Sequence, residues 1–283
     1  MPLLATMARM PPGAFDGLRT KLQCVPFNCL FARSVIEEVV DGTVWCDNER
    51  EPTFAHVIHP YGMTLLLALS ANVNLAALKK HVDGCRRTSA GLWMQIHPQD
   101  LAAEIDRLLD ADLEPAGPAP NGVAVQRHTR SNFLFRPERY ASLAPMRAAS
   151  HDVELRRMTA EDFASFGVSV SPRHFWRNAA QFLAHGGGWC VARNGEAVTT
   201  AFASFRMGSQ LEIGVETCAE HRGRGYAKLG ASALIDQCVE SGIEPVWSCR
   251  KQNVASYELA LALGFSPTVE GAYYHLPRVP LQS

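Results

Sequence analysis

A glycine-rich, basic stretch, "EHRGRGYAKLGASALIDQCVE" at residues 220–240, is the part of the sequence best suited to bind a small molecule. Gly223 and Gly225 carry no Cβ atoms, so successive backbone N–H groups can converge on one point. The apolar pattern after them predicts a helix, whose first N–H groups lack partners and carry a partial positive charge. Three basic side chains flank the turn: Arg222, Arg224 and Lys228. The stretch therefore predicts a cradle for a phosphate group.

Two common nucleotide-binding motifs do not fit this turn. The dinucleotide fingerprint Gly-x-Gly-x-x-Gly would need a glycine where the chain has Lys228. The loop Gly-x-x-x-x-Gly-Lys-Ser/Thr, typical of nucleoside triphosphate sites, does not occur in the sequence. The pattern thus favours a pyrophosphate-bearing cofactor that is not a Rossmann ligand. A tight strand-to-helix turn with solvated basic side chains is the alternative that the residues alone leave open.

Strands and helices on both sides must hold this turn in place. The preceding residues, "QLEIGVETC" at 210–218, alternate like a strand. A buried strand is expected at 244–249, and "NVASYELALALGF" after it predicts a helix that ends at Gly264. Upstream, the pair Asn194-Gly195 within "GWCVARNGEAVTTAFASF" is typical of a hairpin between two strands.

The second half of the chain is predicted to follow the order β, α, α, β, β, β, α, β, α, β. Its first helix begins after Thr159, which we expect to be the N-cap. Its second helix is expected over residues 171–185, with Ser171 as N-cap, Pro172 at the first position and glycines at the end.

The first half of the chain predicts a mixed α/β domain. Its clearest patterns are strands at 42–47 and 53–60 and helices at 74–85 and 100–111. A proline- and glycine-rich loop at 110–122 and a second soft region at 139–152 interrupt these patterns. We place the domain boundary near residue 148, which gives domains of residues 1–148 and 149–283.

The composition is that of an ordinary globular protein. Hydrophobic residues make up 47%, charged residues 19%, and the net charge of −1 gives no general attraction to nucleic acid or anionic membrane. The sequence has no apolar run long enough to cross a bilayer, and its first residues do not resemble a secretory signal. The eight cysteines form no Cys-x-x-Cys pair, and His56 and His59 have no Cys or His neighbours that suggest a metal site. We therefore expect a cytoplasmic protein without a metal, and without nucleic-acid or membrane partners.

The turn and its surroundings resemble the GCN5-related N-acetyltransferase (GNAT) family. "HRGRG" is similar to the family's central motif, Gln/Arg-x-x-Gly-x-Gly/Ala, and the predicted element order matches the family over residues 152–277. Two further stretches, "DGTVWCDNEREPTFAHVI" and "PVWSCRKQNVASYELALALGF", are similar to a two-domain subgroup that includes the zwittermicin A resistance acetyltransferase. One departure is Glu220, which stands at the first motif position.

The resemblance implies an α/β (α+β) fold. The C-terminal domain would have a central mixed, mostly antiparallel sheet flanked by helices, and one hypothesis makes the N-terminal domain a diverged half of the same fold. The implied function is transfer of an acetyl (acyl) group from acetyl-CoA to a primary amine of a small molecule, by direct attack in a ternary complex. The protein would act as a monomer or homodimer, and neither the acceptor amine nor the acyl chain length follows from the residues.

The resemblance also implies which residues bind coenzyme A. The turn would bind the pyrophosphate, while the exposed backbone of the preceding strand would pair with the pantetheine arm. The implied cofactor-binding residues are Val215, Thr217, Arg222, Gly223, Arg224, Gly225, Tyr226, Ala227, Asn253 and Ser256. Capping of its own helix is the alternative role for Asn253.

Amine acetylation requires a group that removes a proton from the amine. The candidates are Glu212 and Glu216, which share one strand face unless a bulge separates them. The family's tyrosine, which protonates the leaving thiolate, is replaced here by Ala260, so Tyr257 is the candidate acid, with Tyr273 and Tyr274 as alternatives. The missing tyrosine favours one alternative function, a non-catalytic acyl-CoA-binding or regulatory protein. A nucleotide-binding structural protein is a third hypothesis.

Overall fold

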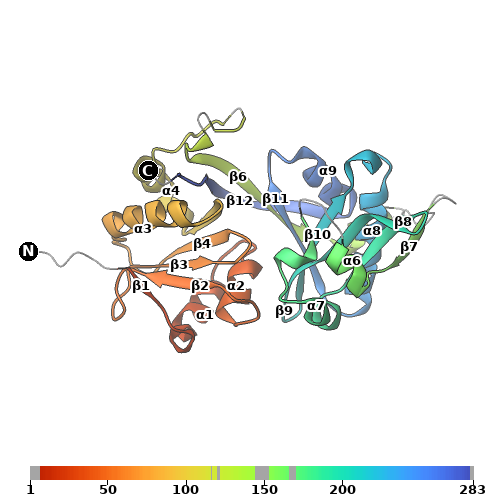
Figure 1. The fold of residues 1–283 in the computed structure, drawn as a ribbon, viewed down its shortest axis with the longest axis horizontal. Coiled ribbons are helices and arrows are strands. Elements are labelled where there is room, and N and C mark those ends of the chain that lie inside the picture. Colours follow the sequence, from red (N-terminus) through yellow and green to blue (C-terminus); the bar gives the residue numbers. More distant parts are fainter. Residues whose placement is uncertain (1–6, 116, 120–121, 144–152, 166–169, 281–283) are drawn as a thin grey trace, which may run out of the picture. The chain divides into compact units, whose positions relative to one another are not determined.

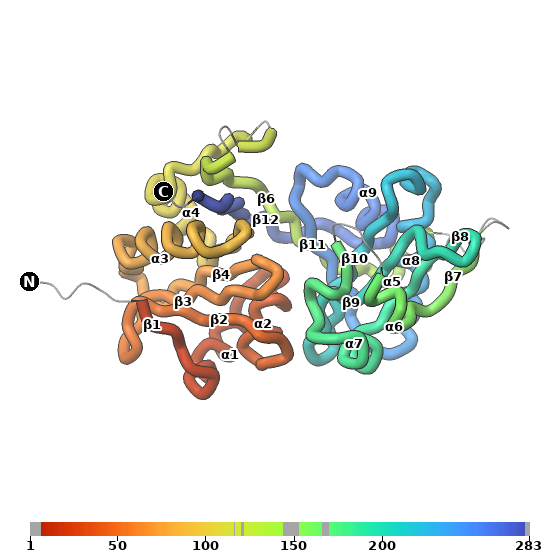
Figure 2. Tube along the Cα trace, viewed as in Figure 1, coloured from red at the N-terminus to blue at the C-terminus, as the bar shows by residue number. Residues whose placement is uncertain are grey.

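A computed structural model describes residues 7–280 of the chain, apart from residues 116, 120–121, 144–152 and 166–169. The chain divides into two compact units (Figures 1 and 2). Unit 1 comprises Met1–Arg130, Arg250–Gln252 and Glu270–Ser283, and unit 2 comprises Ser131–Cys249 and Asn253–Val269. The domain boundary expected near residue 148 lies outside the described residues. Among the described helices, none combines the length and the apolar character that a bilayer span requires.

Unit 1 contains one sheet with helices on both faces. Its elements are β1 (Ala8–Arg9), α1 (Asp16–Gln23), α2 (Leu30–Ile36), β2 (Thr43–Cys46), β3 (Phe54–Ile58), β4 (Met63–Ala68), α3 (Leu75–Thr88), β5 (Leu92–His97), α4 (Ala102–Leu109) and the start of β6 (Gln126–Phe135). Strands β1 to β4 pair antiparallel in chain order, β5 pairs parallel to β4, and the end of β12 pairs antiparallel to β5.

Apolar residues of α3 and α4 form the larger core of unit 1. Leu78 and Val82 of α3 and Ile105 of α4 pack against Phe54 and Met94 of the sheet. Helix α2 contacts β3 and β4 as well. The strands expected at 42–47 and 53–60 and the helix expected at 74–85 are confirmed as β2, β3 and α3. Burial alternates along β2, whereas β3 is buried on both faces.

Unit 2 has a mixed sheet flanked by helices, as the sequence predicted. Its elements are the end of β6, α5 (Pro137–Ser142), β7 (Glu154–Arg157), α6 (Ala160–Ser165), α7 (Ala179–His185), β8 (Gly188–Arg193), β9 (Glu196–Met207), β10 (Gln210–Thr217), α8 (Tyr226–Glu240), β11 (Glu244–Arg250), α9 (Val254–Ala262) and the start of β12 (Phe265–Leu276). Strands β7 to β10 pair antiparallel, whereas β10 and β11 are parallel. Asn194 and Gly195, both at positive φ, join β8 to β9 as expected.

The helix predicted over residues 171–185 is wrong in one respect, because it is two elements. Pro172–His174 form a short 3-10 turn, and α7 begins only after Asn178. The indole N–H of Trp176 donates to the carbonyl oxygen of Ala203 at 2.7 Å, which turns this side chain into the core. The side chain of Asn178 then accepts from the N–H of Gln181 at 2.9 Å and caps a new helix.

The two units share one order of elements. In each, three antiparallel strands are followed by a helix, a strand parallel to the third strand, a second helix and a last strand. The series is β2, β3, β4, α3, β5, α4 and β6 in the first case, and β8, β9, β10, α8, β11, α9 and β12 in the second. Helix α3 of unit 1 therefore corresponds in order to α8 of unit 2.

An ion pair fixes the start of α6 in unit 2 to β7. The buried carboxylate of Asp162 accepts from both terminal nitrogens of Arg156, at 2.6 and 2.9 Å, and from the N–H of Thr159 at 2.7 Å. The hydroxyl of Thr159 accepts in return from the N–H of Asp162 at 3.2 Å, which confirms the expected threonine cap. Burial alone would raise the pKa of Asp162, but these hydrogen bonds hold that pKa below its usual value.

We predict that Asp162→Asn lowers the free energy of unfolding at neutral pH by about 1–3 kcal/mol, because it removes charge-assisted hydrogen bonds. The folded-state pKa of Asp162 is lowered, so its stabilisation is complete above the unfolded-state pKa of about 4 and is lost as the pH falls through the folded-state pKa. Urea unfolding at several pH values measures this. The difference between wild type and variant should shrink from about pH 5 to about pH 3.

The matched control is Glu161→Gln, since Glu161 lies exposed on the same first turn of α6. This variant should change the free energy of unfolding by less than about 0.5 kcal/mol. A loss in Asp162→Asn that stays constant with pH would contradict the assigned role of the carboxylate.

Candidate functional site

Strands β10 and β11 separate soon after they begin to pair. Their register covers only three residues, from Gln210 opposite Glu244 to Glu212 opposite Val246. Residues 213–217 of β10 continue to pair with β9 on the other side. In the part of the chain that the structure describes, the β11-facing edge of residues 213–217 therefore has no partner strand. Val215 and Thr217, predicted to bind the cofactor, lie on this open part of β10.

The corresponding strands of unit 1 stay together. Strands β4 and β5 pair over five residues, from Met63 opposite Trp93 to Leu67 opposite His97. The two units thus have the same order of elements but differ where a ligand could pair with the backbone. Only the parallel pair of unit 2 opens after its third residue.

The turn after β10 has the backbone geometry that its glycines predict. A short 3-10 turn at Ala219–His221 leads to Gly223 and Gly225, whose φ angles are 76° and 80°. Side chains other than glycine rarely adopt such angles. Gly225 is the N-cap of α8 and provides no side-chain acceptor for the first N–H groups of the helix. The predicted strand–turn–helix arrangement is confirmed.

The N–H groups of this turn are available to a ligand. Within the described residues, none of the backbone N–H groups at 223–228 donates a hydrogen bond, and the first one that does belongs to Leu229, to the carbonyl oxygen of Gly225 at 3.0 Å. In unit 1, the side chain of Asn74 instead caps α3 by accepting from the N–H of Ala77 at 3.1 Å. The start of α8 can therefore bind an anion through its backbone, together with the partial positive charge of the helix.

Arg222 links this turn to the end of β10 through hydrogen bonds. Its guanidinium donates to the Glu216 carboxylate at 3.0 Å and to the carbonyl oxygen of Thr217 at 3.1 Å, although the side chain is 63% exposed. Arg224 and Glu220 are both exposed. The exposed position of Glu220 lets this carboxylate point to solvent while the turn binds an anion.

The two candidate bases, Glu212 and Glu216, lie in different surroundings. Glu212 is the last residue of β10 that pairs with β11, its side chain is buried, and one carboxylate oxygen accepts from the hydroxyl of Ser248 at 3.0 Å. The register between β9 and β10 shifts directly after Glu212 and passes over Ser204. This irregularity occurs where a bulge would separate the two carboxylates, and Glu216 is bound by Arg222 instead.

The start of α9 holds the remaining candidates of unit 2. Asn253 caps its own helix by accepting from the N–H of Ser256 at 3.3 Å, and the hydroxyl of Ser256 accepts from the indole N–H of Trp247 at 3.3 Å. Tyr257 is half-buried, with its ring edge-on to Phe133 at 5.0 Å between centroids. Helix α9 thus lies against β11 through polar side chains at its first turn.

Two further positions singled out from the sequence, Ala260 and Tyr226, have buried side chains. Ala260, where the family has tyrosine, is fully buried in α9. Tyr226, predicted to bind the cofactor, packs its ring against Val191 and Val198, so only its backbone can face a ligand at the turn.

The alternative tyrosines belong to unit 1. Tyr274 is fully buried, and its hydroxyl donates to Asp106 at 2.7 Å; burial and this carboxylate raise the pKa of Tyr274. Tyr273 stacks on Trp93 with 4.9 Å between ring centroids. These contacts give both residues roles in the packing of unit 1.

Sequence reasoning did not single out Ser248 as a partner of Glu212. The signal that could have found it is the alternation of "EPVWSCR" in β11. Val246, which lies opposite Glu212, and Ser248 share one face of this strand, so a parallel partner would bring Ser248 near Glu212.

Comparisons with known proteins place these features in a family. The sequence model described as GNAT acetyltransferase matches residues 26–274 of this chain. No curated protein sequence matches the chain. A GCN5-related N-acetyltransferase-like protein from Streptococcus suis has a similar structure, with a TM-score of 0.70 and 17% identity over 93% of this chain and 98% of that chain.

Two further solved structures are similar over nearly the whole chain. A tandem GNAT protein from the clavulanic acid biosynthesis pathway has a TM-score of 0.65 and 12% identity, covering 98% of this chain and 99% of that chain. A Drosophila protein has a TM-score of 0.62 and 14% identity, covering 97% of this chain and 98% of that chain. At these identities the likeness concerns the fold.

We predict that Gly214→Ala lowers the free energy of unfolding by about 1–3 kcal/mol, because β10 has no room for a side chain at this position. A Cβ atom on Gly214 would lie 2.5 Å from the hydroxyl oxygen of Ser204 and 2.8 Å from the ring of Phe202. Denaturant unfolding of the purified variant measures the effect.

The control for this prediction is Gly84→Ala, inside α3, where a Cβ atom would meet nothing within 4 Å. This change should raise the free energy of unfolding by about 0.5–1 kcal/mol, since alanine favours a helix. Equal stability of Gly214→Ala and wild type would show that β9 and β10 lie farther apart than described.

Proposed function

Because the chain belongs to the GNAT acetyltransferase family, we propose that it is an N-acetyltransferase that moves the acetyl group of acetyl-CoA to a primary amine of a small molecule. The observation that carries this proposal is the set of N–H groups at residues 223–228, which donate to no other described residue and lie at the start of a long helix. Such a site suits the pyrophosphate of coenzyme A.

The open edge of β10 supports the same cofactor. A pantetheine arm contains two amides, and an extended chain of this kind can add to an unpaired strand edge through backbone hydrogen bonds. In this proposal it lies along residues 213–217, which have no partner strand on the β11 side in the described chain. In unit 1, β4 and β5 stay paired over five residues and Asn74 caps α3, the counterpart of α8, so we expect one coenzyme A per chain.

The proposed reaction is direct attack of a neutral amine on the thioester carbonyl carbon. Glu212, beside Ser248 where β10 and β11 separate, accepts the proton that the amine loses. The developing oxyanion is bound by backbone N–H groups of the open edge, near Val215. As the carbon–sulfur bond breaks, the thiolate takes a proton from Tyr257, whose hydroxyl has no partner among the described residues.

Several finer assignments belong to the same proposal. We assign the chain to the two-domain subgroup that includes the zwittermicin A resistance acetyltransferase, with unit 1 a diverged half of the fold, because both units share one element order. We also propose that it works in the cytoplasm as a monomer or homodimer. All eight cysteines are free thiols, which suits a reducing compartment.

A second candidate function is acyl-CoA binding without catalysis. The observation in its favour is Ala260, which is fully buried where the family has the tyrosine that protonates the thiolate. This protein would keep the anion site at the turn and the open edge of β10, but would release no thiol from acetyl-CoA with any amine. Binding and turnover therefore have to be measured separately.

We predict that acetyl-CoA raises the thermal unfolding midpoint of the wild type, and that Gly225→Val weakens its affinity at least about tenfold, because a side chain crowds the pyrophosphate. Valine at position 225 would also be strained, because this residue has a φ of 80°, so the control needs the same kind of strain. Gly208→Val is the matched control, since Gly208 has a φ of 58° in the β9–β10 turn and open space around it. Isothermal titration of the three proteins gives the affinities.

Comparison of the two glycine variants separates damage to the pyrophosphate site from the general loss of stability caused by a valine at positive φ. Gly208→Val should bind acetyl-CoA like the wild type. Unchanged affinity in Gly225→Val would remove the turn as the pyrophosphate site, and no binding to the wild type at millimolar acetyl-CoA would reject both candidate functions.

We predict that Glu212→Gln lowers kcat about 10²- to 10⁴-fold without weakening acetyl-CoA binding, because it removes the base. The measurement is release of free thiol from acetyl-CoA with a panel of primary amines. Glu216→Gln should mainly affect KM for acetyl-CoA, since its carboxylate pairs with the exposed Arg222 side chain and such pairs contribute about 0–1 kcal/mol.

Equal turnover in Glu212→Gln and wild type would show that Glu212 is not the base. Tight binding of acetyl-CoA without turnover on any amine of the panel would favour the second candidate function over the first.

A further inference from the structure

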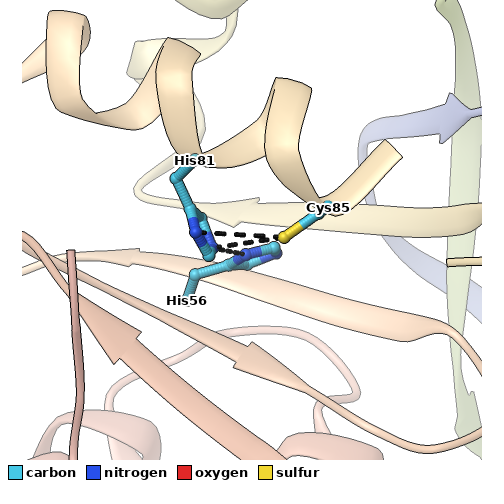
Figure 3. Close-up of side chains that lie close together, drawn as sticks. All are labelled: His56, His81 and Cys85. Carbon is cyan, nitrogen blue, oxygen red and sulfur yellow. Dashed lines mark hydrogen bonds between the residues drawn. The ribbon is translucent and has the colours of Figure 1, made fainter. Parts of the chain in front are cut away.

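Two histidines and a cysteine meet inside the core of unit 1. Figure 3 shows His56 pointing from β3 toward His81 and Cys85, which lie one turn apart on α3. We refer to these three residues as the His–His–Cys cluster. One ligand atom from each lies within 4.8 Å of the others.

The cluster is polar and lies among apolar side chains. His56 is fully buried and His81 is 7% exposed. Leu66 of β4 lies opposite His56, and the ring of Trp45 lies 5.7 Å from that of His81. Nδ1 of His56 lies 2.9 Å from Nε2 of His81, a distance at which the two rings share one hydrogen bond.

This arrangement leaves a buried nitrogen unsatisfied. A neutral imidazole has one N–H donor and one acceptor nitrogen, so each ring needs two partners. Nε2 of His56 is buried and has no hydrogen-bond partner among the described residues. Leaving such a group unpaired in an apolar core costs free energy.

The spacing of the three groups fits one metal ion. Zn–N bonds of about 2.0 Å and Zn–S bonds of about 2.3 Å put ligand atoms of one tetrahedral shell roughly 3.3–3.7 Å apart. The Cys85 sulfur lies 3.6 Å from Nε2 of His81, and the two imidazole nitrogens lie 2.9 Å apart. An ion would need the imidazoles to move apart by only a few tenths of an ångström.

The chemistry of the donors selects the class of metal. Thiolate and imidazole prefer Zn²⁺ or Cu⁺, whereas Mg²⁺ and Ca²⁺ require oxygen ligands. A neutral imidazole has one nitrogen lone pair to donate to such an ion. Cys85 is only partly buried, which gives an ion access to the cluster from solvent.

We propose that His56, His81 and Cys85 bind one Zn²⁺ ion between β3 and α3, with a water or other small ligand in the fourth position. As the Zn–S bond forms, the Cys85 thiol releases its proton to solvent. The ion would tie a strand to the helix that packs on it, and so stabilise unit 1. This site departs from the expectation of no metal, which rested on the absence of ligands near His56 and His59 in the sequence.

The test uses the full chain, freed of metal by a chelator and then given one equivalent of Zn²⁺. After desalting, elemental analysis should find one zinc per wild-type chain and close to none in Cys85→Ser or His81→Gln. Cys24→Ser and His185→Gln are matched controls, because Cys24 and His185 are exposed, and both variants should keep one zinc. Circular dichroism checks that each variant is folded.

Two measurements on the wild type do not depend on any variant. Co²⁺ in place of Zn²⁺ should give the near-ultraviolet absorption of a cobalt–thiolate bond, and Zn²⁺ should slow alkylation of Cys85 by iodoacetamide at least about tenfold, as mass spectrometry of the peptide would show. The proposal would be overturned if the wild type bound no zinc, showed no cobalt–thiolate absorption and was alkylated at Cys85 equally fast with and without Zn²⁺. Full zinc binding by folded Cys85→Ser would overturn it as well.

Discussion

The early end of pairing between β10 and β11 is the constraint on which the candidate site depends. Backbone N–H and C=O groups inside a sheet normally find partners in the next strand. After Glu212, β10 continues to pair with β9, but among the described residues no strand pairs with the other edge of residues 213–217. The turn that follows adds N–H groups that no described residue accepts. Both features have the same consequence, which is a folded unit with backbone donors and acceptors that no described residue uses.

The rest of unit 2 makes this open arrangement stable. Helix α8 contacts β8, β9 and β10, and Leu229 and Tyr226 at its start are buried against Val191 and Val198. Arg222 ties the turn to Glu216 and Thr217 at the end of β10. The helix and the turn are thus positioned by apolar packing and side-chain contacts, without using the backbone N–H groups at 223–228. In unit 1, which has the same order of elements, β4 and β5 pair over five residues and the side chain of Asn74 caps α3.

Features that depend on neighbours in the sequence could be predicted, and features that depend on distant residues could not. The spacing of Gly223 and Gly225 predicted a turn with positive φ before a helix, and Asn194-Gly195 predicted a hairpin; both are observed. The contact between Ser248 and Glu212 joins residues 36 positions apart, so no local pattern reveals it.

Two further cases show the same limit of sequence reasoning. His56 meets His81 and Cys85 only because α3 packs over β3, although the i, i+4 spacing of the latter two was visible in the sequence. The break between Pro172–His174 and α7 also needed tertiary information, since Trp176 leaves the helical path to reach Ala203.

Strands β6 and β12 each begin in one unit and end in the other, and Arg250–Gln252 of unit 1 lie within a stretch that otherwise belongs to unit 2. Neither unit is therefore a contiguous segment of polypeptide, and no single cleavage point yields two intact halves. During synthesis on the ribosome, the sheet of unit 1 is completed beside β5 only after β12, the last of the described strands, has been made. A change in the second half of β12 would for this reason disturb the sheet of unit 1, whose other strands come from the first half of the sequence.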